Sequence, residues 1–308
     1  DAGAATPIAF GLLPGAVMGM IMAAPPSDFI PGVLNGVSGQ YSSRFPTIAG
    51  SSLSASEVQS ILGAAVETAN RVRAGIRQPI GSNARVTISV VDTDGKVLGI
   101  FRQLDAPVFG LDVAVQKART TNFFARTDAA SKLSSAGFGS YVARAAADGL
   151  TLGGSTAFSD RAIGFLHRPL FPDGINNTSA GPFSTELANW SPFNVGLQLD
   201  LVKTAVLTMP VCRTAARTRR TMLPPCPCTA IPELKNGLQI FAGGIPIYRG
   251  TTLIGAIGVS GDGIEQDDLI AAGGANLFAP PEAIRSDKIF VRGVRLPFLK
   301  FPPRPFLP

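Results

Sequence analysis

One stretch near the C-terminus decides the fold of this chain: Asn236-Gly-Leu-Gln-Ile-Phe-Ala-Gly-Gly-Ile-Pro-Ile-Tyr-Arg-Gly-Thr-Thr-Leu-Ile-Gly-Ala-Ile-Gly-Val-Ser-Gly-Asp-Gly-Ile-Glu-Gln-Asp-Asp-Leu-Ile270. A strand rich in isoleucine meets a turn at Arg249-Gly250, and a second strand runs from Leu253 to Ser260. Asp262 and Glu265 then predict an acidic cap at the start of a helix, with further acids in its first turn. The stretch therefore predicts a β-hairpin that leads directly into a helix.

The second strand of this hairpin is interrupted by glycines at positions 255, 258 and 261. Glycine has no side chain, so a neighbouring group can pack very close to the strand at these points. The neighbour is either a helix of the same fold or a flat ligand, and the residues alone favour the helix.

The same stretch resembles the GlcG/HbpS-like family of haem-binding and haem-degrading proteins. The hallmark of that family is a Gly-Gly-(Ile/Val/Leu)-Pro segment, then Gly-Ala-Ile-Gly-Val-Ser-Gly and an acidic Glu-Gln-Asp helix start. Here these segments are Gly243 to Pro246, Gly255 to Gly261 and Glu265 to Asp267. The resemblance implies an α+β fold, an antiparallel sheet packed with helices, and a haem-binding function.

The other half of the pattern lies upstream. Ser54-Ala-Ser-Glu57 is a capping box, and apolar residues follow at helical spacing from Val58 to Val72. Strands at Val86 to Val91 and Lys96 to Phe101 flank Asp92-Thr-Asp-Gly95, which is typical of a hairpin turn. A second helix follows, so the order helix, hairpin, helix, hairpin, helix agrees with the family.

The resemblance also sets the expected domain boundaries. Long, exported members of the family carry segments similar to parts of the middle of this chain and end similarly, which favours one elaborated domain. The first 52 residues are rich in Pro, Gly and Ser, and the last eleven contain four prolines, so both ends are expected to be extended arms. We predict an arm at 1–52, a single domain at 53–297 (core 53–126 and 236–277, long insertion 127–235), and a tail at 298–308.

The composition is that of a folded protein. With 308 residues, of which 45% are apolar and 16% charged, the chain can bury a sizeable core, which excludes a disordered protein. The net charge of +6 is modest, and the arginine cluster at 213–220 has no interleaved aromatic residue. We therefore expect no nucleic-acid partner.

The N-terminal region bears on localisation. The chain begins at Asp1 without an initiator Met, which is typical of a processed, exported protein. The apolar run from Ile8 to Ala24 contains Pro14 and is shorter than the ~20 residues that span a bilayer. We expect no membrane-spanning segment, and a bacterial protein located in the periplasm or outside the cell.

Three cysteines, Cys212, Cys226 and Cys228, fall in one short region. Their spacing does not fit a zinc knuckle, which needs two to four residues between ligands. We expect a disulfide between Cys212 and either Cys226 or Cys228, which would agree with an oxidising compartment.

The chain has a single histidine, His167, so haem with two histidine ligands from one chain is excluded. The residues favour a loop histidine bonded to backbone, and the alternative is a haem-iron ligand. No nucleophile elbow, phosphate loop or pair of catalytic carboxylates is present, so we predict no catalytic residues.

The resemblance places a ligand pocket near the second helix and the glycine-rich strand. A lysine in a helix patterned for burial either extends its head to solvent or meets an anion such as a propionate. The two threonines that follow it would lie close to an iron, and a tyrosine would wall the pocket unless it packs in the core. The predicted cofactor-binding residues are Lys117, Thr120, Thr121, Tyr248, Gly255 and Gly258, with His167 as a candidate metal ligand.

Two functions follow from these observations. The first is an extracytoplasmic module that binds haem or a related flat, anionic cofactor as a scavenger, sensor or carrier. The second is a structural subunit, in a homo-oligomer or a larger complex held through the terminal arms, that keeps the fold without the ligand. A small-molecule enzyme is a third hypothesis, for which the residues give no positive sign.

Overall fold

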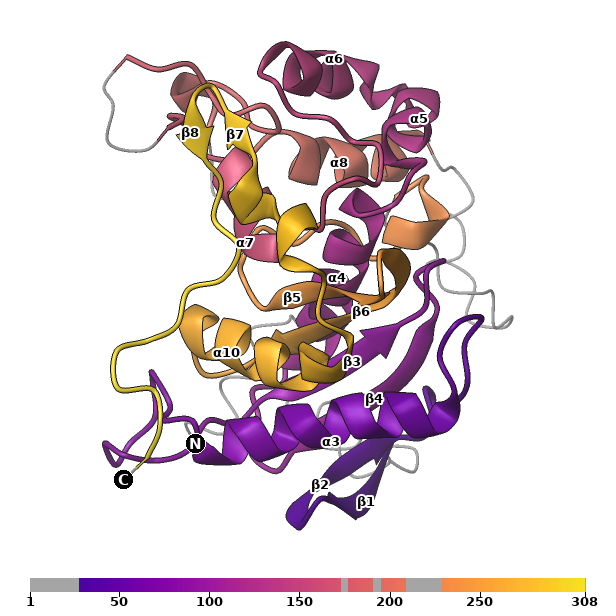
Figure 1. Cartoon of the computed structure of the whole chain (residues 1–308), viewed down its shortest axis with the longest axis vertical. Helices are drawn as coiled ribbons and strands as arrows, with labels where there is room; N and C mark the ends of the chain where they lie inside the picture. The colour runs from indigo at the N-terminus through magenta and orange to yellow at the C-terminus, as the bar shows by residue number, and fades with distance from the viewer. Residues whose placement is uncertain (1–27, 173–176, 191–194, 209–228, 308) are drawn as a thin grey trace, which may run out of the picture.

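The computed structural model describes residues 28–172, 177–190, 195–208 and 229–307. Figure 1 shows a twisted sheet with helices on its faces and, above it, a second layer of helices that comes mainly from the insertion. The predicted fold class, an antiparallel sheet packed with helices and elaborated by a long insertion, is confirmed. In the described part of the chain no helix is both long and apolar enough to cross a bilayer.

Within the described ranges the sheet has six strands, and every neighbouring pair is antiparallel. The two hairpins predicted from the sequence form its centre and one edge, and Ser89 pairs with Gly258 where they meet. The strand order is β1-β2-β4-β3-β6-β5. The strands are β1 (Phe29–Leu34), β2 (Val37–Ser42), β3 (Thr87–Val91), β4 (Val97–Gln103), β5 (Gly244–Arg249) and β6 (Thr252–Ser260).

Strands β1 and β2 correct the prediction of an arm at 1–52, because they extend the sheet along β4. Their turn is Asn35-Gly36, and both residues have positive φ, at 47° and 78°. Asn-Gly is the preferred sequence for such a two-residue hairpin turn. Tyr41 packs edge-on against Phe101 with ring centroids 5.0 Å apart and fixes the hairpin to β4. Residues 1–27 of the predicted arm lie outside the described residues.

Helices cover both faces of the sheet. The main core lies between one face and helices α3 (Ala55–Arg71) and α10 (Ile264–Ala275), and it includes Ile257 of β6. The next residue back along the strand, Ala256, belongs to a separate cluster with α4 (Gly110–Phe124) on the opposite face. This alternation follows from the two-residue period of a strand.

The starts of two helices test the capping predictions. The capping box at the start of α3 is confirmed, since Ser54 and Glu57 satisfy each other's backbone N–H groups. The predicted acidic cap of α10 is wrong, because its N-cap is Gly263 and no side chain caps it. The Asp262 carboxylate instead accepts hydrogen bonds from the backbone of Arg85 (2.8 Å) and from the side chain of Arg77, so a tertiary contact replaces the local cap.

The insertion builds a second hydrophobic core above the sheet. Phe123 and Phe124 at the end of α4 belong to this core, so α4 is shared between the two layers. The insertion contributes the helices α5 (Ala129–Leu133), η1 (Ser134–Phe138, a π-turn), α6 (Gly139–Ala147), α7 (Asp160–Leu166) and α8 (Leu197–Thr208). The hairpin of β7 (Phe290–Val291) and β8 (Val294–Arg295), from the C-terminal part of the chain, packs with them. Short 3-10 turns lie at η2 (Leu187–Asn189), η3 (Pro232–Leu234), η4 (Asn276–Phe278), η5 (Glu282–Ile284) and η6 (Ser286–Lys288).

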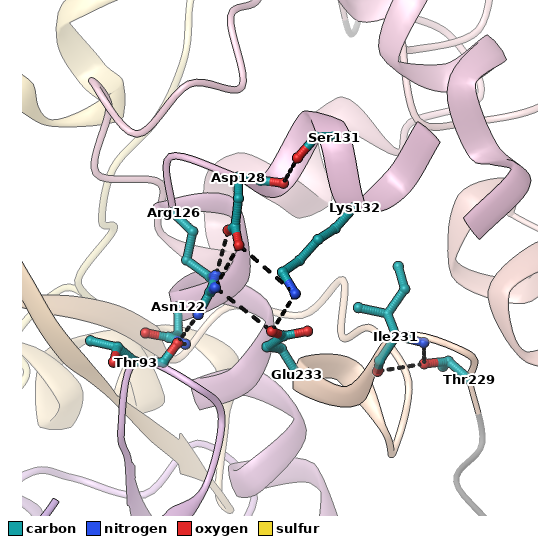
Figure 2. Close-up of polar contacts among 9 residues, drawn as sticks. All are labelled: Thr93, Asn122, Arg126, Asp128, Ser131, Lys132, Thr229, Ile231 and Glu233. Carbon is teal, nitrogen blue, oxygen red and sulfur yellow. Dashed lines mark hydrogen bonds and ion pairs between the residues drawn. The ribbon is translucent and has the colours of Figure 1, made fainter. Parts of the chain in front are cut away.

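Ion pairs tie the two ends of the insertion to each other (Figure 2). Glu233, just before the core resumes, accepts from Lys132 at 2.8 Å and lies 3.7 Å from Arg126. Arg126 also pairs with Asp128 at 2.7 Å, and it donates to the carbonyl of Thr93 in the β3–β4 turn. We call Arg126, Asp128, Lys132 and Glu233 the insertion clamp, because it holds the start and the return of the insertion against the sheet.

The proline-rich tail docks on its own chain. The backbone of Arg73 donates to Pro305 at 2.8 Å, Leu307 donates to Arg71 at 2.9 Å, and Val72 and Phe306 form an antiparallel bridge. The tail therefore continues as an extended segment beside the end of α3.

Candidate functional site

Lys117 is buried, at 1% exposure, and its charge is matched inside the fold. The ammonium Nζ donates to the Asp267 carboxylate at 2.8 Å and to the carbonyl of Val259 at 2.8 Å. Of the two alternatives that the sequence left open, an ammonium in solvent or one that meets an anion, the structure has the second. The anion here is a side chain of α10, 150 residues away in the chain.

The two threonines of α4 are also buried and bonded within the chain. Thr120 donates to the carbonyl of Gln116 at 2.8 Å and accepts from the backbone of Gln239 at 2.9 Å. Thr121 donates to the carbonyl of Phe158. Both hydroxyls thus fasten α4 to neighbouring segments.

The glycines of β6 allow close packing of the chain on itself. A Cβ at Gly258 would collide with the backbone of Ala114 and lie 2.5 Å from the amide of Ala118, so α4 is the close neighbour. Gly255 has a φ of +147°, and a Cβ there would collide with the carbonyl of Val91 on the adjacent strand. A helix on one glycine and a strand on the other therefore account for the glycine pattern.

Tyr248 and His167 are both buried, each in its own surroundings. Tyr248 is buried in a cluster with Ala125 and Ala157, and burial raises the pKa of its phenol. His167 ends α7, and its Nδ1 lies 2.8 Å from the carbonyl of Ile163, as expected for a histidine bonded to backbone. Burial lowers the His167 pKa to about 4, so the ring is neutral at physiological pH.

The described residues contain no group of three His, Cys, Asp or Glu side chains positioned for a metal ion. Cys212, Cys226 and Cys228 fall outside the described residues, so their predicted disulfide stays a prediction. The residues predicted from the sequence are therefore brought together in part. Lys117 and Gly258 lie at the contact between α4 and β6, whereas Thr120 and Thr121 bond to Gln239 and Phe158. The remaining predicted residues, Tyr248, Gly255 and His167, have other neighbours.

A buried charge cluster surrounds Lys117 and includes residues that the sequence analysis missed. It comprises Lys117, Asp160, Arg161, Asp267 and Asp268. The Asp160 carboxyl is fully buried, neither oxygen has a hydrogen-bond partner among the described residues, and burial raises its pKa well above the usual range. Burial also raises the pKa of Asp267 to about 6, against the opposing effect of the Lys117 charge.

The cluster explains the Gly-Gly pair of the quoted stretch. A Cβ at Gly243 would lie 2.7 Å from the Asp267 Cβ and 3.0 Å from the Lys117 Nζ. A Cβ at Gly244 would collide with the Asp160 carboxyl. The two glycines are therefore the places where the backbone of β5 approaches the buried charges.

Asp268 connects this cluster to an open groove. Its Oδ2 accepts from Arg161 Nε of α7 at 2.5 Å and from the backbone N–H of Lys300 at 3.0 Å. Arg161 and Lys300 both line the groove, so one buried carboxylate holds its two sides in place.

The groove lies between α7 and the C-terminal segment and has a volume of about 610 Å³. Three aromatic rings line it, from Phe165, Phe298 and Phe301. Its lining contains one carboxylate, Asp287, and five cations. We call it the cationic groove; the cations are Arg161, Arg168, Arg285, Arg295 and Lys300.

The groove holds like charges close together. Burial lowers the pKa of Arg168, and the nearby charge of Arg161 lowers it further. Two guanidinium groups stack on lining aromatics: Arg168 lies 5.1 Å from the ring centroid of Phe165, and Arg285 lies 5.2 Å from that of Phe298. Planar cations on aromatic faces suit a ligand that is both flat and negatively charged.

Little in the sequence could have located this groove. Arg161 and Arg168 are seven residues apart, and no motif around them marks a ligand site. The phenylalanines of the C-terminal segment belong to residues predicted to form an extended tail. Only the docking of the tail, through Asp268 and the bridge at Phe306, brings them to one place.

The organic part of haem, the cofactor implied by the resemblance, fits the groove. Its carboxylates suit the arginines, and its flat face suits the phenylalanines. Among the residues that the structure describes, the lining does not fit the iron, because it includes no His, Cys, Met or Tyr.

The fold and the groove together define an α+β domain with a cationic, aromatic-lined surface site. Comparison with known families places part of this chain more closely: the family model described as "Haem degrading protein HbpS-like" matches residues 205–276. This match confirms the resemblance that the motifs from Gly243 to Asp267 indicate. No curated protein sequence matches the chain significantly.

Three solved structures are similar to this chain at low identity. Klebsiella pneumoniae protein ORFY is 18% identical, over 72% of this chain and 86% of that one, with a TM-score of 0.35. The complex of PduOC with haem is 18% identical, over 73% and 94%, with a TM-score of 0.33. A double mutant of Streptomyces reticuli HbpS is 16% identical, over 74% and 88%, with a TM-score of 0.31.

Proposed function

We propose that this protein binds a flat, anionic small molecule in the cationic groove, with haem as the candidate ligand. The observation that carries the proposal is the groove itself, in which five cations and three aromatic rings surround about 610 Å³. The match to the HbpS-like family model supports haem as the first ligand to test. The buried charge cluster has the structural role of supporting one wall of the groove through Asp268.

The proposal extends to where and how the protein acts. We propose an exported protein, periplasmic or extracellular, that serves as a scavenger, sensor or carrier of its ligand. The three clustered cysteines support an oxidising compartment. A protein that binds and releases a ligand needs no catalytic group, and none is assigned here.

A haem titration tests the binding proposal. Haem added to the purified protein is expected to give a saturable change in the Soret region. Replacing Arg168 and Arg295 together by Ala should weaken binding at least tenfold, because each guanidinium can make a charge-assisted bond to a carboxylate. Arg44→Ala is the matched control, since Arg44 is exposed and does not line the groove. Equal affinity in all three proteins would place any haem elsewhere.

One observation favours the alternative of an assembly subunit. Strand β1 forms an edge of the sheet, and its Ile30 and Val33 are 57% and 63% exposed. An exposed apolar edge strand can pair with another chain. Under this alternative, Val33→Lys should reduce the molar mass measured by light scattering after gel filtration, and Ser38→Lys in β2 serves as the control. An unchanged mass would count against pairing through β1.

A further inference from the structure

The further inference concerns what the cationic groove recognises in its ligand, and it rests on the proposed function. The starting point is the chemistry of the lining. Iron in haem is held in proteins by histidine, thiolate, thioether or phenolate side chains. Of the described residues, twelve line the groove, and none of these twelve carries one of these groups.

The remaining groups of the lining that could bind a metal are already engaged. The Asp287 carboxylate accepts two hydrogen bonds from Arg285, at 3.1 and 3.0 Å. The Lys300 ammonium is paired with the Glu265 carboxylate at 2.6 Å. Neither side chain is available as a ligand without breaking an ion pair.

The nearest histidine in the chain faces the wrong way. His167 is adjacent to the lining residue Arg168, yet it is 1% exposed. Its ring lies 5.4 Å from that of Phe183 in the second core, and Nδ1 is bonded to Ile163. Bringing Nε2 to the groove would require the ring to leave this core.

The groups that do face a ligand recognise charge and flatness. Arg161 and Arg168 both line the groove, and burial together with the charge of Arg161, which is also paired with Asp268, lowers the pKa of Arg168. Guanidinium groups match carboxylates in shape as well as charge. Phe301, which is 47% exposed, offers an apolar face to a planar ring system.

We infer that the cationic groove recognises the carboxylates and the flat face of its ligand and not a metal, so that it binds a metal-free dicarboxylate tetrapyrrole as well as the iron form. The metal then contributes nothing to affinity at this site. Esterification of the two carboxylates, which leaves the ring unchanged, removes most of the affinity.

Three ligands separate this inference from the proposed function. Hemin, protoporphyrin IX and protoporphyrin IX dimethyl ester are titrated into the full chain under identical cosolvent, with binding followed by calorimetry and by absorbance. We expect hemin and protoporphyrin IX to bind within threefold of each other and the ester at least tenfold more weakly. The Arg168→Ala, Arg295→Ala double variant should lose at least tenfold for both acids, while Arg44→Ala should lose nothing.

Each other outcome has a distinct meaning. If hemin binds and protoporphyrin IX binds more than tenfold more weakly, the inference is overturned and the proposed function stands. A spectrum of bound hemin that changes on His167→Ala would overturn it in the same way. If neither acid binds, the proposed function fails together with the inference. An ester that binds as well as the acid would refute the role of the arginines.

Discussion

Replacing the two buried aspartates that lie near Lys117 should change stability to very different extents. Asp267→Asn removes the only carboxylate bonded to the Lys117 ammonium among the described residues, and breaking a buried ion pair from one side costs about 3–5 kcal/mol. The ammonium keeps the carbonyl of Val259 and can donate to the new amide oxygen, so we expect the lower end, about 3 kcal/mol. Asp160→Asn replaces a carboxyl that burial holds protonated, so we expect a change within about 1 kcal/mol.

Urea unfolding followed by far-ultraviolet circular dichroism at pH 7 measures both variants. The two substitutions are chemically identical, and both sites are buried, so each serves as the control for the other. If Asp160→Asn lost as much free energy of unfolding as Asp267→Asn, Asp160 would be ionised and the assignment of charge in the cluster would be refuted. A loss below about 1 kcal/mol for Asp267→Asn would show that Lys117 does not depend on its partner.

Three further predictions concern the glycine pair, the insertion clamp and the tail. Gly244→Ala should lower the free energy of unfolding by about 2–3 kcal/mol, since its Cβ meets the Asp160 carboxyl, while Gly250→Ala, with open space around it, should lose less; urea unfolding compares them. Glu233→Gln should cost about 1 kcal/mol by weakening its pairs with Lys132 and Arg126, whereas Glu282→Gln in an exposed pair should leave the melting temperature unchanged. Deleting residues 300–307 should cost roughly 2–3 kcal/mol, since it removes three backbone hydrogen bonds to the domain, and a truncated chain that melts like the full chain would refute the docking.

The elements that depend on neighbouring residues were predictable from the sequence. The capping box at Ser54, the turn at Asp92 to Gly95 and the turn at Arg249-Gly250 each encode their geometry within four residues. The Asn35-Gly36 turn carries an equally local signal, but the surrounding glycines and prolines led to the prediction of an arm. The signal for β1 and β2 was therefore present in the sequence and was outweighed by composition.

The site depends on partners far apart in the sequence, which no local pattern encodes. The sequence singled out Lys117 and left open whether it reaches solvent or meets an anion, and nothing near it in the sequence identifies Asp267 as its partner. In the sequence, Asp160 and Arg161 are typical of the first turn of a helix. Their burial could not be predicted, because it depends on how α7 packs against Gly244. The cationic groove was missed for the same reason, since its two sides are joined through Asp268.

The position of helix α4 determines how this molecule can come apart. One part of the helix, with Ala114 and Ala118, packs on the sheet, and its end, with Phe123 and Phe124, belongs to the core of the insertion. If either core unfolds, α4 loses part of its packing, and the other core then loses the support of α4. Although the chain is long enough for two domains, the sheet and the insertion should therefore melt together, as a single cooperative unit.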